Sequence, residues 1–108
     1  MATKEEKQWM NDLVEVGCIV CRLNGVYSPP DIHHVLRAGK RQSHLFTIPL
    51  CPIHHRSGNN NDIATSRHPY KRDFERRYGT ENELLEQTKL FVRELRSGKT
   101  DRRHPFEP

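Results

Sequence analysis

The chain has no apolar run near 18 residues, and only 33% of its 108 residues are hydrophobic. The missing run argues against a membrane-spanning helix, and residues 1–6 lack the apolar segment of a signal peptide. We therefore expect a cytosolic protein. A chain this short with so few apolar residues predicts one small domain with a thin core, and such domains usually depend on a metal, a disulfide or a partner.

Cysteine is also scarce. The chain has three cysteines, an odd number, so they cannot all form disulfides within one chain. In a reducing compartment, Cys18-x2-Cys21 indicates metal binding or redox chemistry rather than a disulfide. The redox alternative makes Cys51 an ordinary buried thiol. It is weaker, because no thioredoxin-like βαβ pattern follows and His54 stays unexplained.

Capping signals predict the two longest helices. Thr3 and Glu6 have capping-box spacing, and Gly17 can end the helix that follows. Thr80 and Glu83 repeat the spacing before an apolar stripe that runs to about residue 98.

The middle of the chain predicts short elements. Residues 31–36 and 45–50 are strand candidates, residues 22–30 and 37–44 are connections, and Pro52 opens a helix of about one and a half turns. Another helix is expected between Pro69 and Gly79. We predict a single α+β domain over residues 1–98, with its core motif at about 17–58, C-terminal helices at 69–98 and a loose basic tail at 99–108.

Two x2 pairs give four metal ligands on two tight turns. Cys18 and Cys21 form the first pair, and Cys51 and His54 form the second. Three thiolates and one imidazole match a closed tetrahedral structural zinc site. Such a zinc would also supply stability that the thin core lacks.

Four further histidines exceed what that zinc needs. His55 points about 100° away from His54 on a helix, so it is expected to serve a second metal together with His33. His34 is then the candidate general base, and His68 is a candidate third ligand, with a capping or surface role equally open. Neighbours on a regular strand face opposite sides, so His33 and His34 can converge on one phosphate only if the strand bends or ends there.

The formal net charge of +4 suits a polyanionic partner. Four basic residues lie close to the ligand motifs and are candidates for holding flanking phosphates: Arg37, Lys40, Arg41 and Arg56. The alternative for each is solvated surface charge.

As a set, these motifs resemble an HNH endonuclease of the ββα-metal type. They read Cys18-x2-Cys21, then Asp31 to Val35, then Leu50 to Arg56. The chain resembles more closely the bacteriophage recombination-enhancement (Ref) nucleases over roughly residues 12–92. There the signature is Gly-Cys-Ile-Val-Cys, Ile-His-His and Thr-Ile-Pro-Leu-Cys-Pro-x-His-His-Arg. The middle Asn of the HNH name has no counterpart between Leu45 and Leu50; His44 and Thr47 lie nearest.

The resemblance implies a metal-dependent DNA endonuclease of phage or prophage origin, acting in a bacterial host with a RecA-type recombinase filament. It implies that His34 is the general base and that His33 and His55 are metal ligands. A structural Zn²⁺ and a catalytic Mg²⁺ or Mn²⁺ are expected, although histidine ligands favour Zn²⁺ in a resting site.

Two other functions stay open on the sequence. A zinc-stabilised nucleic-acid-binding module without catalysis would need the Cys3His site but gives His33, His34 and His55 no task. A protein-interaction adaptor would use Tyr70, Phe74 and Tyr78 as an exposed face, whereas we expect this helical stripe to be core packing.

Overall fold

The computed structural model describes residues 3–37, 40–41 and 43–97. In chain order its elements are α1 (Lys4–Val16), α2 (Ile19–Leu23), β1 (Asp31–His34), β2 (Leu36–Arg37), β3 (Lys40–Arg41), β4 (Thr47–Leu50), α3 (Pro52–His55), α4 (Lys71–Tyr78) and α5 (Glu81–Ser97). This is the small α+β domain that the sequence predicts. The predicted tail at 99–108 lies outside the described residues.

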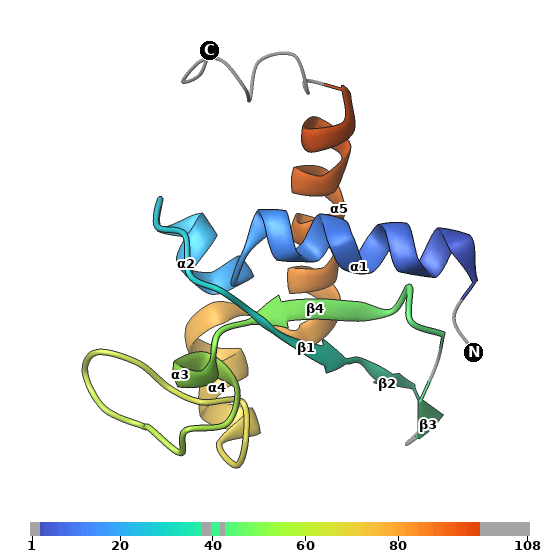
Figure 1. Cartoon of the computed structure of the whole chain (residues 1–108). Coiled ribbons are helices and arrows are strands. Elements are labelled where there is room, and N and C mark those ends of the chain that lie inside the picture. Colours follow the sequence, from blue (N-terminus) through green and yellow to red (C-terminus); the bar gives the residue numbers. More distant parts are fainter. Residues whose placement is uncertain (1–2, 38–39, 42, 98–108) are drawn as a thin grey trace.

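The centre of the fold is the antiparallel pair β1–β4, in which His33 lies opposite Ile48. Helices α1 and α5 contact each other, and both contact β4 (Figure 1). Every residue of β4 is buried, because it lies against both helices. The side chains buried here include Leu13, Ile19, Ile48, Leu50, Leu84 and Leu85.

Both predicted capping boxes are present. The Thr3 hydroxyl accepts from the Glu6 N–H at 3.0 Å and the Glu6 carboxylate accepts from the Thr3 N–H at 2.9 Å. Thr80 and Glu83 repeat the exchange at the start of α5. Gly17 ends α1 with φ of 79°, a left-handed value that favours glycine.

Several short elements differ from their predicted bounds. Residues 22–30 were predicted as a connection, but α2 extends to Leu23; its first turn closes when the Arg22 N–H donates to the Cys18 carbonyl at 2.8 Å. The first predicted strand stops at His34, and the second starts only at Thr47, because residues 44–46 form a turn. The short helix α3 ends at His55. The β2–β3 pair joins Leu36, at the end of the first predicted strand, to the predicted connection at 37–44.

The aromatic stripe of α4 is only partly core. Phe74 is fully buried, and Tyr78 packs on it with ring centroids 5.0 Å apart. Tyr70 precedes the helix and is 37% exposed, so the prediction that it is core is wrong.

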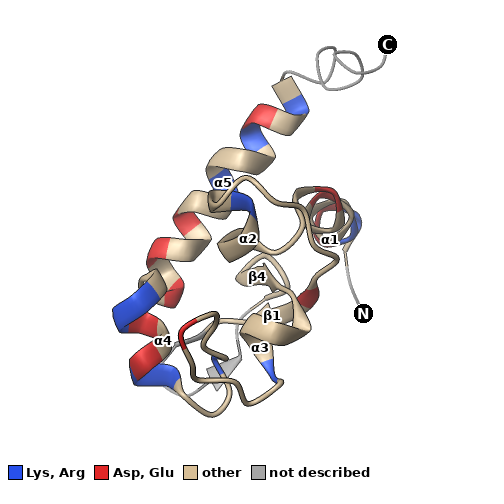
Figure 2. Cartoon of the chain, turned by 90° about the vertical axis from the view of Figure 1, so that its left-hand side faces the viewer, with Lys and Arg blue, Asp and Glu red and all other residues tan. Residues whose placement is uncertain are grey.

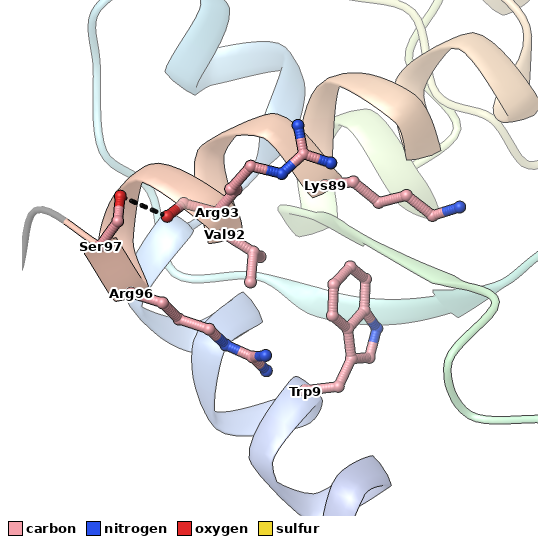
Figure 3. A pocket seen from close by; sticks show the side chains of 6 residues that line it. All are labelled: Trp9, Lys89, Val92, Arg93, Arg96 and Ser97. Carbon is pink, nitrogen blue, oxygen red and sulfur yellow. Dashed lines mark hydrogen bonds between the residues drawn. The ribbon is translucent and has the colours of Figure 1, made fainter.

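A surface pocket of about 520 Å³ lies between α1 and α5 (Figure 3). Its lining residues are Trp9, Lys89, Val92, Arg93, Arg96 and Ser97. Arg96 closes one side, since its Nε donates to Asp12 of α1 at 2.9 Å. Among the described residues, no helix combines the length and the apolar character that crossing a membrane requires.

Candidate functional site

The structure gathers Cys18, Cys21, Cys51 and His54 into one cluster. Cys18 caps α2 and Cys21 lies within it, whereas Cys51 caps α3 and His54 lies within that helix. The cluster therefore joins two short helices that are separated by the β1–β4 pair in sequence.

The spacing of the four ligand atoms fits a tetrahedral zinc ion. With Zn–S near 2.3 Å and Zn–N near 2.0–2.1 Å, sulfur atoms should lie about 3.8 Å apart and sulfur and nitrogen about 3.6 Å apart. The Cys21 and Cys51 sulfurs are 3.9 Å apart. His54 Nδ1 lies 3.6, 3.7 and 3.2 Å from the sulfurs of Cys18, Cys21 and Cys51, respectively.

Burial affects the ionisation of these ligands. It raises the pKa of the Cys18 thiol to about 12 and raises that of Cys51 as well. Burial, together with the charge of Arg77, lowers the pKa of His54 and keeps its ring neutral. Thiolates at such positions need a bound cation, which the donor set suits.

A second cluster contains His33, His55 and His68, whose ligand atoms lie within 4.8 Å of one another. The three ring centroids are 5.1, 5.3 and 5.2 Å apart, so the rings surround a common point. His33 Nδ1 and His55 Nε2 are 3.3 Å apart, close to the separation of about 3.3 Å expected for two nitrogens on one tetrahedral zinc. These residues can hold a metal ion.

His33 and His55 each contact a carboxylate through the ring nitrogen that faces away from the cluster. His33 Nε2 lies 2.8 Å from Glu81, and His55 Nδ1 lies 3.1 Å from Asp31. A carboxylate at one ring nitrogen fixes the proton there and turns the other nitrogen's lone pair toward the metal. The outer contacts thus prepare His33 Nδ1 and His55 Nε2 as ligands.

Two arginines hold these carboxylates in their ionised form. Although burial alone would raise the pKa of Glu81, hydrogen bonds from His33 and Arg67 lower it to about 2. The hydrogen bond from Arg56, 2.7 Å away, lowers the pKa of Asp31, with a further contribution from His55. Burial and the nearby Arg67 charge lower the pKa of His68, which keeps that imidazole neutral.

Helix α3 divides its two histidines between the clusters, as the 100° rotation per residue predicts. His54 belongs to the Cys3His cluster and His55 to the histidine cluster. The backbone after the loop runs alongside α3: the Arg67 N–H donates to the His54 carbonyl and the His68 N–H to the His55 carbonyl, both at 2.9 Å. This pairing places His68 beside His55.

His34 ends β1, so the strand stops at the point that the sequence argument requires. Its side chain contacts His44. His34 Nε2 lies 3.0 Å from His44 Nδ1, and the two ring centroids are 5.2 Å apart.

The basic residues predicted to hold phosphates lie on two segments. Arg37 is on β2, and Lys40 and Arg41 are on β3, where Arg37 pairs with Lys40. Arg56 follows α3, and its side chain is 61% exposed beside Asp31. Charges of both signs alternate along α4 and α5 (Figure 2), so those helices do not form a single basic face.

Comparison with known protein families shows to which family the chain belongs. The model of the recombination enhancement, RecA-dependent nucleases matches residues 2–92. The chain belongs to this nuclease family. No curated protein matches it.

Three residues of this Ref-family chain contribute to the site without having been predicted to do so. Glu81 is 48 positions from His33, and it stands in the first turn of α5 between the two capping-box residues Thr80 and Glu83. Asp31 was noted only as part of the His-His motif, and His44 only as a neighbour of the missing Asn. An acidic residue at the start of a helix usually signals helix stabilisation, so no local pattern could have revealed the contact between Glu81 and His33.

Proposed function

We propose that this chain is an HNH-type, metal-dependent DNA endonuclease that acts with a RecA-type recombinase. The observation that carries the proposal is the histidine cluster with its two carboxylates. A structural site is normally closed by four protein ligands, whereas three imidazoles leave a coordination position for water or substrate. This arrangement suits hydrolysis of a phosphodiester.

Each member of the site has a proposed task. His33, His55 and His68 hold the catalytic cation, and Glu81 and Asp31 orient the first two of these. The bound cation would polarise the scissile phosphate and offset charge on the departing oxygen. The ββα-metal core then corresponds to β1, β4 and α3, with Cys18, Cys21, Cys51 and His54 as a structural zinc site.

His34 is proposed as the general base. A neutral imidazole with its hydrogen on Nε2 donates to His44 Nδ1, 3.0 Å away, and places its basic lone pair on Nδ1. That nitrogen would take a proton from the attacking water. Arg37, Lys40, Arg41 and Arg56 are proposed to hold the neighbouring phosphates.

The decisive experiment is cleavage of plasmid and single-stranded DNA, with and without a RecA filament, in Mg²⁺ or Mn²⁺. General-base catalysis typically contributes roughly 10²–10⁴-fold, so His34→Ala should lose about that much rate while DNA affinity stays near wild type. His55→Ala should lose both cleavage and the second metal. Retained zinc at one equivalent per chain and an unchanged melting curve are the folding controls.

The same variants separate this proposal from a binding module without catalysis. The Cys3His cluster is complete without the histidine cluster, so a zinc-stabilised binding domain needs only the first. If His34→Ala and His55→Ala behave like wild type in every cleavage and binding assay, the endonuclease proposal is wrong and the binding module takes its place.

A further inference from the structure

Two side chains of helix α1 contact the turn at 43–46 and the first residue of β4 that follows it. The second oxygen of Glu6, Oε2, accepts from the His44 N–H at 3.1 Å. One turn further along α1, the Trp9 indole N–H donates to the Thr47 hydroxyl at 2.9 Å. Helix α1 lies outside the β1–β4–α3 unit. Its Glu6 contacts His44 directly, and its Trp9 contacts Thr47, which in turn contacts His44.

The backbone of His44 is held at both ends. The Thr47 hydroxyl donates to the His44 carbonyl at 2.7 Å, while Glu6 takes the N–H. Thr47 is fully buried and lies opposite His34 in the β1–β4 register. Trp9 is 7% exposed, and its ring stands beside Val92 of α5 (Figure 3). The side chains of Thr47 and Trp9, which lead to the His44 carbonyl, are therefore both buried in the protein.

Stabilisation of helix α1 and of the core accounts for only some of the contacts made by Glu6, Trp9 and Thr47. The capping box of α1 uses the other oxygen of Glu6, Oε1, which accepts from the Thr3 N–H. The bond from the His44 N–H uses the second oxygen, Oε2, and is not one of the two bonds of that cap. A buried indole N–H needs an acceptor, but the Thr47 hydroxyl also passes its own hydrogen to His44. What the three contacts share is a fixed His44 backbone.

We propose that α1 is part of the catalytic apparatus: Glu6, Trp9 and Thr47 fix His44, and the His44 imidazole positions His34. This inference rests on the proposed role of His34 as general base. A hydrogen bond from His34 Nε2 to His44 Nδ1 fixes both the tautomer and the ring plane of the base. Misplacement of a reacting group by about 1 Å can cost roughly 10²-fold in rate.

Three substitutions at His44 test the imidazole. In asparagine the side-chain oxygen occupies nearly the position of Nδ1, whereas in glutamine it is one methylene further out. We expect His44→Ala to lower kcat for DNA cleavage by roughly 10²-fold with little change in KM. His44→Asn should recover most of that loss, and His44→Gln should recover little.

Matched variants test the contribution of α1. Glu6→Ala removes one bond of the capping box, from the Thr3 N–H, together with the contact with His44. Thr3→Ala removes the other bond of the box, from the residue 6 N–H, and leaves the contact with His44 in place. Thr47→Val removes the hydroxyl link. We expect Glu6→Ala and Thr47→Val to lower kcat by roughly tenfold and Thr3→Ala to leave it unchanged, with all three proteins compared below their melting transitions.

The outcomes distinguish this inference from the proposed function. If His34→Ala cleaves normally, the base assignment itself fails. If His34→Ala is inactive but His44→Ala matches wild type, or His44→Asn is no better than His44→Ala, the positioning role of His44 is overturned. Equal losses in Thr3→Ala and Glu6→Ala would show that fraying of α1, not the contact with His44, lowers the rate.

Discussion

Removing the charge of Glu81 should weaken metal binding by the histidine cluster without disturbing the Cys3His cluster. Glu81 lies 2.8 Å from His33 Nε2, and its lowered pKa keeps it ionised at neutral pH. Loss of such an outer carboxylate typically costs 10–100-fold in metal affinity, which is about 1.4–2.8 kcal/mol. Glutamine keeps a neutral acceptor, so Glu81→Gln should fall toward the lower end of this range.

The assay is calorimetric titration of Mn²⁺ into protein that already carries one zinc. Glu86→Gln is the matched control, because it removes an equal charge from the same helix at an exposed residue that pairs with exposed Lys89. We expect the control to bind Mn²⁺ like wild type. If Glu81→Gln also binds within about twofold of wild type, the carboxylate does not prepare His33 as a ligand and the reasoning is refuted.

Three further predictions concern folding. Cys51→Ser should remove the one zinc equivalent bound by the Cys3His cluster and lower the melting temperature, as should chelation of the wild type, since structural zinc contributes folding energy; metal analysis and thermal melts check both. Phe74→Ala should cost about 3–5 kcal/mol in urea unfolding because the side chain is fully buried; Tyr70→Ala, at an exposed position, should cost far less. Thr80→Ala should cost about 1 kcal/mol by removing the cap of α5, and a midpoint equal to wild type would contradict that role.

Sequence reasoning succeeded where the determining interactions are local. Both capping boxes involve residues three positions apart, so Thr3 and Thr80 mark helix starts that the structure confirms. Local spacing also predicts part of each cluster that could hold a metal ion. An x2 pair on a turn and a 100° step on α3 constrain the directions of Cys51, His54 and His55.

It failed where distant segments decide the outcome. Leu45 and Phe46 are apolar and continue the pattern of β4, yet they lie in a turn. The Phe46 N–H donates to the Ser43 carbonyl within this turn, and distant Glu6 of α1 accepts from the His44 N–H. Helix α2 was missed because five residues give too weak a periodicity. The contact between Glu81 and His33 depends on how α5 packs against β4, the partner strand of β1, and a single sequence does not contain that information.

The division of His54 and His55 between two clusters makes length, rather than composition, the constrained property of α3. Insertion of one residue between them would rotate His55 by about 100° and advance it by about 1.5 Å, away from His33 and Asp31. Exchange of one side chain in α3 would weaken a single contact. A change in the length of α3 would instead move His54 and His55 relative to each other and disrupt the arrangement of both clusters at once. Natural variation in this segment should therefore consist of substitutions, with insertions and deletions confined to the loop at 57–66.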